Sequence, residues 1–278
     1  MVSPQMAAGI ARTMTSVQTT LKRLVRSTFQ SFGYDIVPFP IDQWSEQRLT
    51  LGRHLIQILR RCRINCVFDV GAHYGEYGEF LRELGYSGKL ISFEPVSTNF
   101  KQLRIRAEKD PLWHAYHMAL GSEDTLMDIK VFHESELSSF LTPNDYCASH
   151  MGSGDLVSGL ERVQVRTVDT VFDECVADIV EPRVYLKLDT QGYELAVLQG
   201  ATCHLDGIQG LQAEVSIKPI YEAMPSYLES LPKMRDLGFE VTGLFPVNRD
   251  RNLRLIEVDC VMVRNGAAEV RALSGTVR

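Results

Sequence analysis

A glycine turn separates a strand pattern from a helix pattern in the stretch Val67-Phe68-Asp69-Val70-Gly71-Ala72-His73-Tyr74-Gly75-Glu76-Tyr77-Gly78. The apolar run 66–70 predicts a buried strand, and the apolar positions of 76–84 share one face of a helix. Gly71 and Gly75 allow backbone angles that a side chain would forbid, so the turn can pass close beneath a ligand and expose N–H groups to it. The stretch therefore predicts a ligand cradle at the carboxyl end of a first strand.

The turn differs from the dinucleotide fingerprint G-x-G-x-x-G at one decisive position. His73 stands where the second glycine of that fingerprint lets a pyrophosphate approach, which disfavours a nicotinamide cofactor. The turn instead resembles motif I of class I S-adenosylmethionine-dependent methyltransferases. A ribose-binding carboxylate is then expected at the end of the next strand, and Glu94 ends the strand pattern 89–94 about 20 residues after Gly75.

Length and composition suit one large α/β core, since 45% of the 278 residues are hydrophobic. The net charge of −6 gives no reason to expect a nucleic-acid-binding surface. Six cysteines lack the spacing of a disulfide framework or a zinc site, which indicates a reducing, cytoplasmic setting. No uncharged apolar stretch approaches the roughly 18 residues that span a bilayer, so no transmembrane segment is expected.

The first 34 residues carry four basic side chains and no acid. Apolar residues recur at helical spacing over 16–32, which predicts a basic amphipathic helix. This helix is expected to pack on the domain or on a partner subunit of a homo-oligomer, and peripheral contact with anionic lipid is the alternative. With a second helix expected at 45–61, residues 1–62 form a predicted N-terminal helical extension.

Strand and helix patterns alternate over a predicted domain at 63–266, which indicates a mostly parallel sheet. The final two strands follow a short turn and are expected to form an antiparallel hairpin. The segment 134–162 lacks periodicity and is predicted to be a lid-like insertion, with extended pieces at 125–132 and 163–167 beside it. Residues 267–278 are predicted to be a tail. The other expected strands are 66–70, 89–94, 113–120, 183–189, 209–216, 239–245 and 254–263, and the other expected helices are 76–84, 97–108 with Ser97 as its cap, 169–176, 193–202 and one ending at Gly238.

A lysine interrupts a second apolar strand, in the stretch Val184-Tyr185-Leu186-Lys187-Leu188-Asp189. By the two-residue period, Lys187 and Asp189 share a face, and Asp189 ends the strand where open α/β sheets bind ligands. Glu214 lies near the end of the next strand. These residues allow two interpretations. One is a structural Lys187–Glu214 ion pair with Glu194 in the first turn of a helix, and the other is a set of carboxylates around an acceptor.

Several motifs occur in the order found in the FkbM family of methyltransferases, which the chain resembles over about residues 66–264. The resemblance implies a class I methyltransferase fold, a mostly parallel seven-stranded sheet whose last strand is antiparallel. It also implies S-adenosylmethionine as methyl donor and O-methylation of a hydroxyl in a polyketide-type metabolite, or in a sugar of a glycolipid or polysaccharide. His73 departs from the family, which usually has Asn there. The motifs are Phe68-Asp69-Val70-Gly71-Ala72-His73-Tyr74-Gly75, Ser92-Phe93-Glu94-Pro95 with Asn99, Ala119-Leu120-Gly121, Ser138-Ser139-Phe140-Leu141, Val168-Asp169, Lys187-Leu188-Asp189-Thr190-Gln191-Gly192-Tyr193-Glu194 and Ala213-Glu214-Val215.

The resemblance assigns the cofactor site to residues at the ends of the first strands. A carboxylate can accept hydrogen bonds from two adjacent ribose hydroxyls, which suits Glu94. The expected cofactor-binding residues are Asp69, Gly71, Ala72, His73, Tyr74, Gly75, Glu94, Pro95, Asn99, Ala119, Leu120 and Ser139.

Methyl transfer to an aliphatic hydroxyl needs a group that helps to remove the proton. Asp189 is the expected base, with Glu214 and Lys187 as the other catalytic residues, and His133 and His150 are alternative bases. A divalent ion such as Mg²⁺, held by Asp189 and Glu214, is possible but not favoured, because Lys187 can already neutralise one carboxylate. The acceptor is expected to be a small molecule or a glycolipid. A non-catalytic subunit that binds an adenosine ligand and a nicotinamide-dependent oxidoreductase remain as rival functions.

Overall fold

The computed structural model describes residues 25, 28–29, 43–151 and 156–266. The chain divides into two compact units, Met1–Arg48 and Leu49–Arg278, and the sheets belong to the second. The predicted helix at 16–32 lies outside the described residues except at three exposed helical positions, and the predicted tail lies wholly outside them. Within the described ranges, no helix combines the length and the apolar character that crossing a membrane requires.

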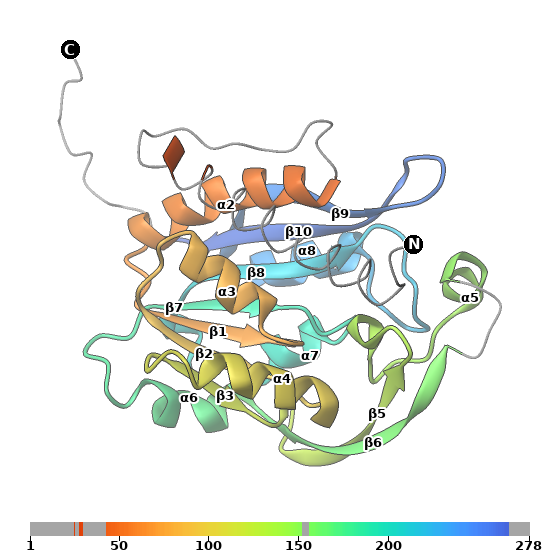
Figure 1. Ribbon diagram of the computed structural model, residues 1–278, viewed down its shortest axis with the longest axis horizontal. Coiled ribbons are helices and arrows are strands. Elements are labelled where there is room, and N and C mark those ends of the chain that lie inside the picture. Colours follow the sequence, from red (N-terminus) through yellow and green to blue (C-terminus); the bar gives the residue numbers. More distant parts are fainter. Residues whose placement is uncertain (1–24, 26–27, 30–42, 152–155, 267–278) are drawn as a thin grey trace, which may run out of the picture. The chain divides into compact units, whose positions relative to one another are not determined.

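Seven strands form one sheet in the order β3-β2-β1-β7-β8-β10-β9 (Figure 1). Strands β3, β2, β1, β7 and β8 are parallel, whereas β10 is antiparallel to both β8 and β9. This arrangement confirms the predicted fold with its antiparallel last strand. The strand order reverses between β1 and β7, and such a switch point is where open sheets bind ligands. The strands are β1 Cys66–Val70, β2 Lys89–Phe93, β3 Trp113–Tyr116, β7 Val184–Leu188, β8 Ile208–Ser216, β9 Phe239–Arg249 and β10 Leu255–Arg264.

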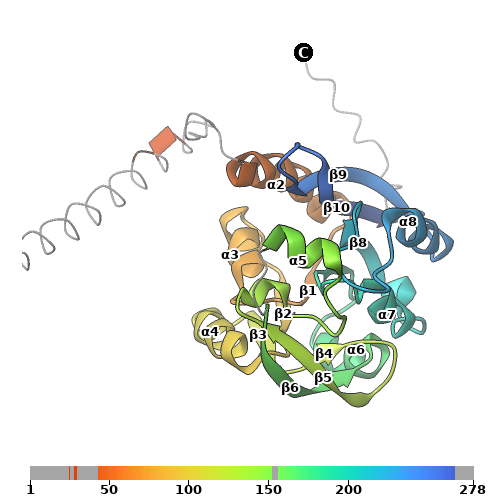
Figure 2. The same cartoon turned by 90° about the vertical axis from the view of Figure 1, so that its right-hand side faces the viewer.

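Helices cover both faces of this sheet, and α3 and α4 lie on the side opposite α6 and α7 (Figure 2). Alternate strand residues face opposite ways, so Val67 packs with apolar residues of α2, α3 and α4, whereas Phe68 packs with those of α6, α7 and α8. Ser97 was expected to cap α4, but Val96 is the N-cap, and the N–H and hydroxyl of Ser97 donate to Glu161. The helices are α2 Gln43–Arg61, α3 Glu76–Glu83, α4 Ser97–Ala107, α6 Val168–Val176, α7 Glu194–Gln199 and α8 Tyr227–Asp236, with a 3₁₀ turn, η2, at Leu205–Gly207.

A second sheet joins β4 (Ala119–Leu120), β6 (Val157–Arg166) and β5 (Thr125–Phe132) in that order. The single strand expected at 113–120 is therefore wrong, because the chain turns after β3 and β4 pairs with β6 instead. Strand β6 starts within the segment expected to be an insertion, because it pairs along the whole of β5. The described remainder of that segment contains η1 (Ser135–Leu137) and α5 (Asp145–Met151).

Candidate functional site

The turn after β1 is shaped by the end of the neighbouring strand β7. Gly71 has a φ of +78°, and a Cβ atom at this position would lie 1.9 Å from the backbone oxygen of Asp189. Gly75 has a φ of +96° and is the N-cap of α3. Glycine is therefore required at Gly71 for two reasons, the left-handed backbone and the contact with β7. The same contact brings the predicted cofactor turn against the predicted base.

At residues 71–75 the turn departs from the expectation that it exposes N–H groups to a ligand. Acceptors within the chain already take the N–H groups of residues 71–75. The donors and acceptors are Gly71 and Ala72 to Phe93 O (3.0 and 3.1 Å), His73 to Glu94 Oε2 (2.8 Å), Tyr74 to Glu76 Oε2 (3.1 Å) and Gly75 to Ala72 O (2.8 Å). Residues 71–75 therefore offer no free N–H group to a pyrophosphate.

Glu94 follows β2 and is almost completely buried beside the turn. Its carboxylate accepts hydrogen bonds from the N–H of His73 (2.8 Å), the N–H of Val96 (2.9 Å) and the amide of Asn99 (3.4 Å). Burial raises the pKa of Glu94 to about 7, and these donors oppose the rise only in part. A carboxylate held by neutral donors keeps further acceptor capacity, which fits the two hydroxyls of a ribose.

The remaining predicted cofactor residues fall into two groups. Asp69 and Tyr74 lie in or beside the turn, and Pro95 follows Glu94 at the end of β2. Ala119 and Leu120 are buried in β4, where they pair with β6.

Ser139 and His73 both contact residues outside the predicted cofactor site. The hydroxyl of Ser139 donates to Gln191 O (2.8 Å) in the loop after β7, so its contact is with that loop. The His73 ring lies 2.8 Å from Ser135 Oγ of η1, which Tyr74 also approaches at 3.1 Å. The segment that contains η1 therefore touches the turn.

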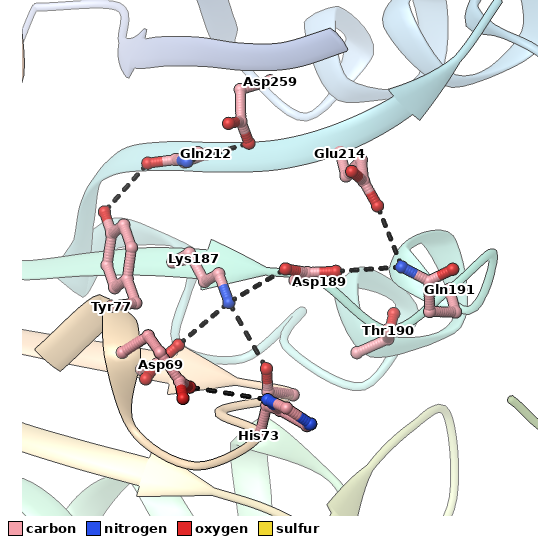
Figure 3. Close-up of polar contacts among 12 residues, drawn as sticks. Asp69, His73, Tyr77, Lys187, Asp189, Thr190, Gln191, Gln212, Glu214 and Asp259 are labelled. Carbon is pink, nitrogen blue, oxygen red and sulfur yellow. Dashed lines mark hydrogen bonds and ion pairs between the residues drawn. The ribbon is translucent and has the colours of Figure 1, made fainter. Parts of the chain in front are cut away.

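Lys187 lies at the centre of the charged groups, where its ammonium contacts two carboxylates (Figure 3). Its Nζ atom is 3.1 Å from Asp69 Oδ1 and 3.3 Å from Asp189 Oδ2, and it donates to Gly71 O at 3.4 Å. The predicted Lys187–Glu214 ion pair is wrong for a reason of register. Lys187 lies opposite Asp69 on β1 and opposite Gln212 on β8, so Glu214 lies two residues further along its strand.

Burial and neighbouring charges shift the pKa values of Lys187 and Asp69 in opposite directions. Burial alone lowers the pKa of Lys187, but the carboxylates of Asp69 and Asp189 outweigh it and raise that pKa. Burial raises the pKa of Asp69, and the charge and hydrogen bond of Lys187 oppose this rise. Asp69 is 1% exposed, whereas the side chain of Asp189 is 40% exposed. Asp189 is therefore the member of this trio that a ligand can reach.

Gln191 connects the two carboxylates that were predicted to surround the acceptor, and sequence reasoning assigned it no role. Its Nε2 donates to Asp189 Oδ1 (3.3 Å) and to Glu214 Oε2 (3.0 Å), as Figure 3 shows. The motif Lys187-Leu188-Asp189-Thr190-Gln191 contains this residue, but its positive φ of 54° directs the side chain in a way that two-residue spacing does not predict.

Glu214 belongs to a second group of acids, on β8 and β10. Burial raises the pKa of Glu214 well above its ordinary value, and the charges of Glu257 and Asp189 add to the rise. Burial also raises the pKa of Glu257 to about 7, while the amide of Asn248 donates to its Oε2 at 3.0 Å. Glu257 was not predicted as a site residue, because nothing in the sequence distinguishes one acid in a hairpin strand from an ordinary surface acid.

The alternative bases and the metal ligands receive no support from the described residues. His133 is exposed at the end of β5, and the side chain of His150 lies outside the described part of the chain. Across the described ranges, no group of three or more His, Cys, Asp or Glu residues is arranged to hold a metal ion. Between Asp189 and Glu214 there is instead the amide of Gln191.

Comparison with known proteins gives a family match for most of the chain. The model of the methyltransferase FkbM domain matches residues 69–241. The chain is similar to the solved methyltransferase FkbM from Methylobacillus flagellatus KT, with 14% identity and a TM-score of 0.48 over 72% of this chain and 43% of that one. It is also similar to magnesium protoporphyrin IX methyltransferase from Synechocystis PCC 6803 with bound S-adenosylmethionine, with 10% identity and a TM-score of 0.42 over 87% of this chain and 96% of that one. The chain thus spans less than half the length of the first of these structures. No match was found among curated proteins.

Proposed function

Because the chain belongs to the FkbM methyltransferase family, we propose that it transfers the methyl group of S-adenosylmethionine to a hydroxyl oxygen. The acceptor is a sugar of a glycolipid or polysaccharide, or a polyketide-type metabolite. The residues around Glu94 suit the methyl donor, since a buried carboxylate with acceptor capacity lies beside the turn that follows β1.

One observation carries this proposal: the cofactor turn and the accessible carboxylate are in contact. The backbone of Asp189 approaches Gly71 so closely that a Cβ atom there would lie 1.9 Å from Asp189 O, and the N–H of Asp189 donates to Val70 O at 3.0 Å. Alignment of acceptor and donor supplies much of the rate of such a displacement. Backbone contacts therefore hold the turn after β1 next to Asp189 at the end of β7.

Methyl transfer to a hydroxyl requires the protein to remove the hydroxyl proton and to align the acceptor with the methyl donor. S-adenosylmethionine supplies an electrophilic methyl group on a sulfonium, and the electrons of the broken C–S bond remain on sulfur. Asp189 accepts the proton of the acceptor hydroxyl while the oxygen forms its bond to the methyl carbon. Lys187, 3.3 Å from Asp189 Oδ2 and itself paired with Asp69, holds this carboxylate in place.

A divalent ion on Asp189 and Glu214 is the less favoured route to the same end. Such an ion needs several oxygen ligands, yet the amide N–H₂ of Gln191 lies between these carboxylates. A donor group in that position repels a cation, so the residues present do not fit a metal ion well.

A hydroxyl-rich acceptor suits the acids around Asp189. The side chain of Asp189 is 40% exposed, and Glu214 lies next to it across the amide of Gln191. Carboxylates accept hydrogen bonds from several sugar hydroxyls at once, which supports a sugar over a less polar polyketide. Membrane contact and homo-oligomer formation were assigned to the helix at 16–32, and they remain predictions because that helix lies largely outside the described residues.

The experiment is methyl transfer from labelled S-adenosylmethionine into a glycolipid and polysaccharide extract, with products identified by mass spectrometry. Asp189→Asn is expected to lower kcat by about 10²–10⁴-fold and to leave S-adenosylhomocysteine binding unchanged. Asp206→Asn, on a fully exposed side chain, serves as the matched control with wild-type activity. Full activity of Asp189→Asn would contradict the proposal, and failure of wild-type protein to label any acceptor would favour the non-catalytic binding subunit.

A further inference from the structure

Gln191 has every polar atom of its side chain engaged, although it lies in a loop. It is 9% exposed, and its φ of 54° is a left-handed conformation that residues other than glycine rarely adopt. The amide nitrogen donates to Asp189 and Glu214, and the amide oxygen accepts from the hydroxyl of Tyr221 at 3.1 Å. Its backbone oxygen accepts from Ser139 Oγ at 2.8 Å. Contacts with several segments therefore hold Gln191 in this uncommon conformation.

The partners of Gln191 come from parts of the chain that are far apart in sequence. Asp189 ends β7 and Glu214 belongs to β8, whereas Tyr221 follows β8 and Ser139 follows η1. The Tyr221 hydroxyl also lies 2.7 Å from Leu137 O, so its proton is shared between η1 and Gln191. The segment around η1 therefore reaches the two carboxylates through a single residue.

We propose that Gln191 is the positioning residue of the acceptor site, which holds Asp189 and Glu214 apart in their working orientation and joins them to the segment around η1. This inference rests on the proposed role of Asp189 as base. The two N–H groups of one amide, each directed at a different carboxylate, set both the spacing and the orientation of the pair.

Removing this amide changes the electrostatics in a definite direction. Each N–H of the amide donates to one carboxylate, and without the amide the two like charges face each other directly. Lys187 remains paired with Asp69 and Asp189, so its charge does not reach Glu214 by a direct contact. The other groups that face the two carboxylates are Glu194 from α7, Glu257 and Asp259 from β10, and Tyr221 from the loop after β8.

The test is Gln191→Met, which keeps the length of the side chain and removes its polar atoms. Carboxylate pKa values of the S-adenosylhomocysteine complex are measured by ¹³C NMR titration, which needs no acceptor. We expect the pKa of Glu214 to rise by about one unit further, because its carboxylate loses the amide N–H that it accepts from Gln191. The kcat should fall about tenfold, because Asp189 loses the amide that holds it in its working orientation, whereas the affinity for S-adenosylhomocysteine should stay unchanged.

Two further variants separate positioning from a merely structural role. Tyr221→Phe removes the hydroxyl that holds the Gln191 amide oxygen and should raise the pKa of Glu214 by a smaller amount. Gln164→Met makes the identical chemical change on an exposed position of β6 and should leave the titration and kcat unchanged.

The outcomes distinguish this inference from the proposed function. An unchanged pKa of Glu214 in a folded Gln191→Met protein that binds S-adenosylhomocysteine normally would overturn the positioning role, and so would an unchanged kcat. If Asp189→Asn retains full activity, the base itself has been misassigned and the proposed function fails. Loss of activity in Asp189→Asn beside normal titration in Gln191→Met refutes the positioning role alone.

Discussion

Replacing Lys187 by methionine removes the only ammonium that contacts Asp69 among the ion pairs of the described residues. Lys187 Nζ lies 3.1 Å from Asp69 Oδ1, and the two side chains are 7% and 1% exposed. Methionine keeps the approximate length of the lysine stem but not its charge. The carboxylate of Asp69 is then left buried, with Ser92 Oγ as its remaining donor at 3.2 Å.

The loss of stability in Lys187→Met depends on whether Asp69 stays charged or binds a proton. Breaking a buried ion pair by removing one partner typically costs about 3–5 kcal/mol. Asp69 can avoid the charge penalty by binding a proton, at a free-energy cost of about 1.4 kcal/mol for each pH unit above an unfolded pKa of about 3.9. Protonation therefore limits the charge penalty to about 4 kcal/mol near pH 7 and to about 1.5 kcal/mol near pH 5.

The pH dependence has a definite sign. Burial already raises the pKa of Asp69, and the variant loses the lysine that opposes this rise. A carboxyl whose folded pKa lies above its unfolded pKa stabilises the protein fully below the unfolded pKa, and this stability is lost as the pH rises through the folded pKa. Lys187→Met should therefore be destabilised more near pH 7 than near pH 5.

Urea unfolding of both proteins at the two pH values measures this difference. Lys89→Met is a matched control, because Lys89 is also largely buried but its partner Asp178 is exposed and remains hydrated. Its effect should be small and the same at both pH values. The double variant Asp69→Asn/Lys187→Met should recover at least half of the loss. An equal deficit at both pH values, or a double variant no more stable than Lys187→Met, would refute the reasoning.

Three other perturbations test neighbouring parts of the site. Glu94→Gln should weaken S-adenosylhomocysteine binding by about 1.5–3 kcal/mol in calorimetry. Wild-type affinity should fall as the pH drops through the Glu94 pKa of about 7, since the protonated carboxyl accepts fewer hydrogen bonds, and the variant should lose this dependence. Gly71→Ala should cost about 3 kcal/mol or more in unfolding free energy, because its Cβ meets a backbone oxygen at 1.9 Å, whereas Gly85→Ala, with open space around its Cβ, should cost only about 1 kcal/mol. Exhaustive chelation should leave methyl transfer intact, and inactivation that Mg²⁺ reverses, with Glu214→Gln as damaging as Asp189→Asn, would establish the metal route instead.

Much of the fold follows from patterns that are local in the sequence. Apolar runs and helical spacing place β1, β2, β7 and β8 and the helices between them, because burial of one face imposes a period on each element. The glycines of the turn and the acid after β2 mark the ligand end of the sheet, since their spacing reflects one strand–helix–strand unit. Local patterns failed at 113–120, where one apolar run is shared between two sheets.

The candidate site depended on contacts that no local pattern encodes. The sequence alone determined that Lys187 and Asp189 share a face and that Glu94 ends a strand, because alternation along a strand is an intrinsic property of the backbone. Only the tertiary structure decided that Lys187 pairs with Asp69 and that the Gln191 amide separates Asp189 from Glu214. The physical reason is that the register between strands, and the left-handed backbone at Gln191, are set by the packing of segments far apart in the chain.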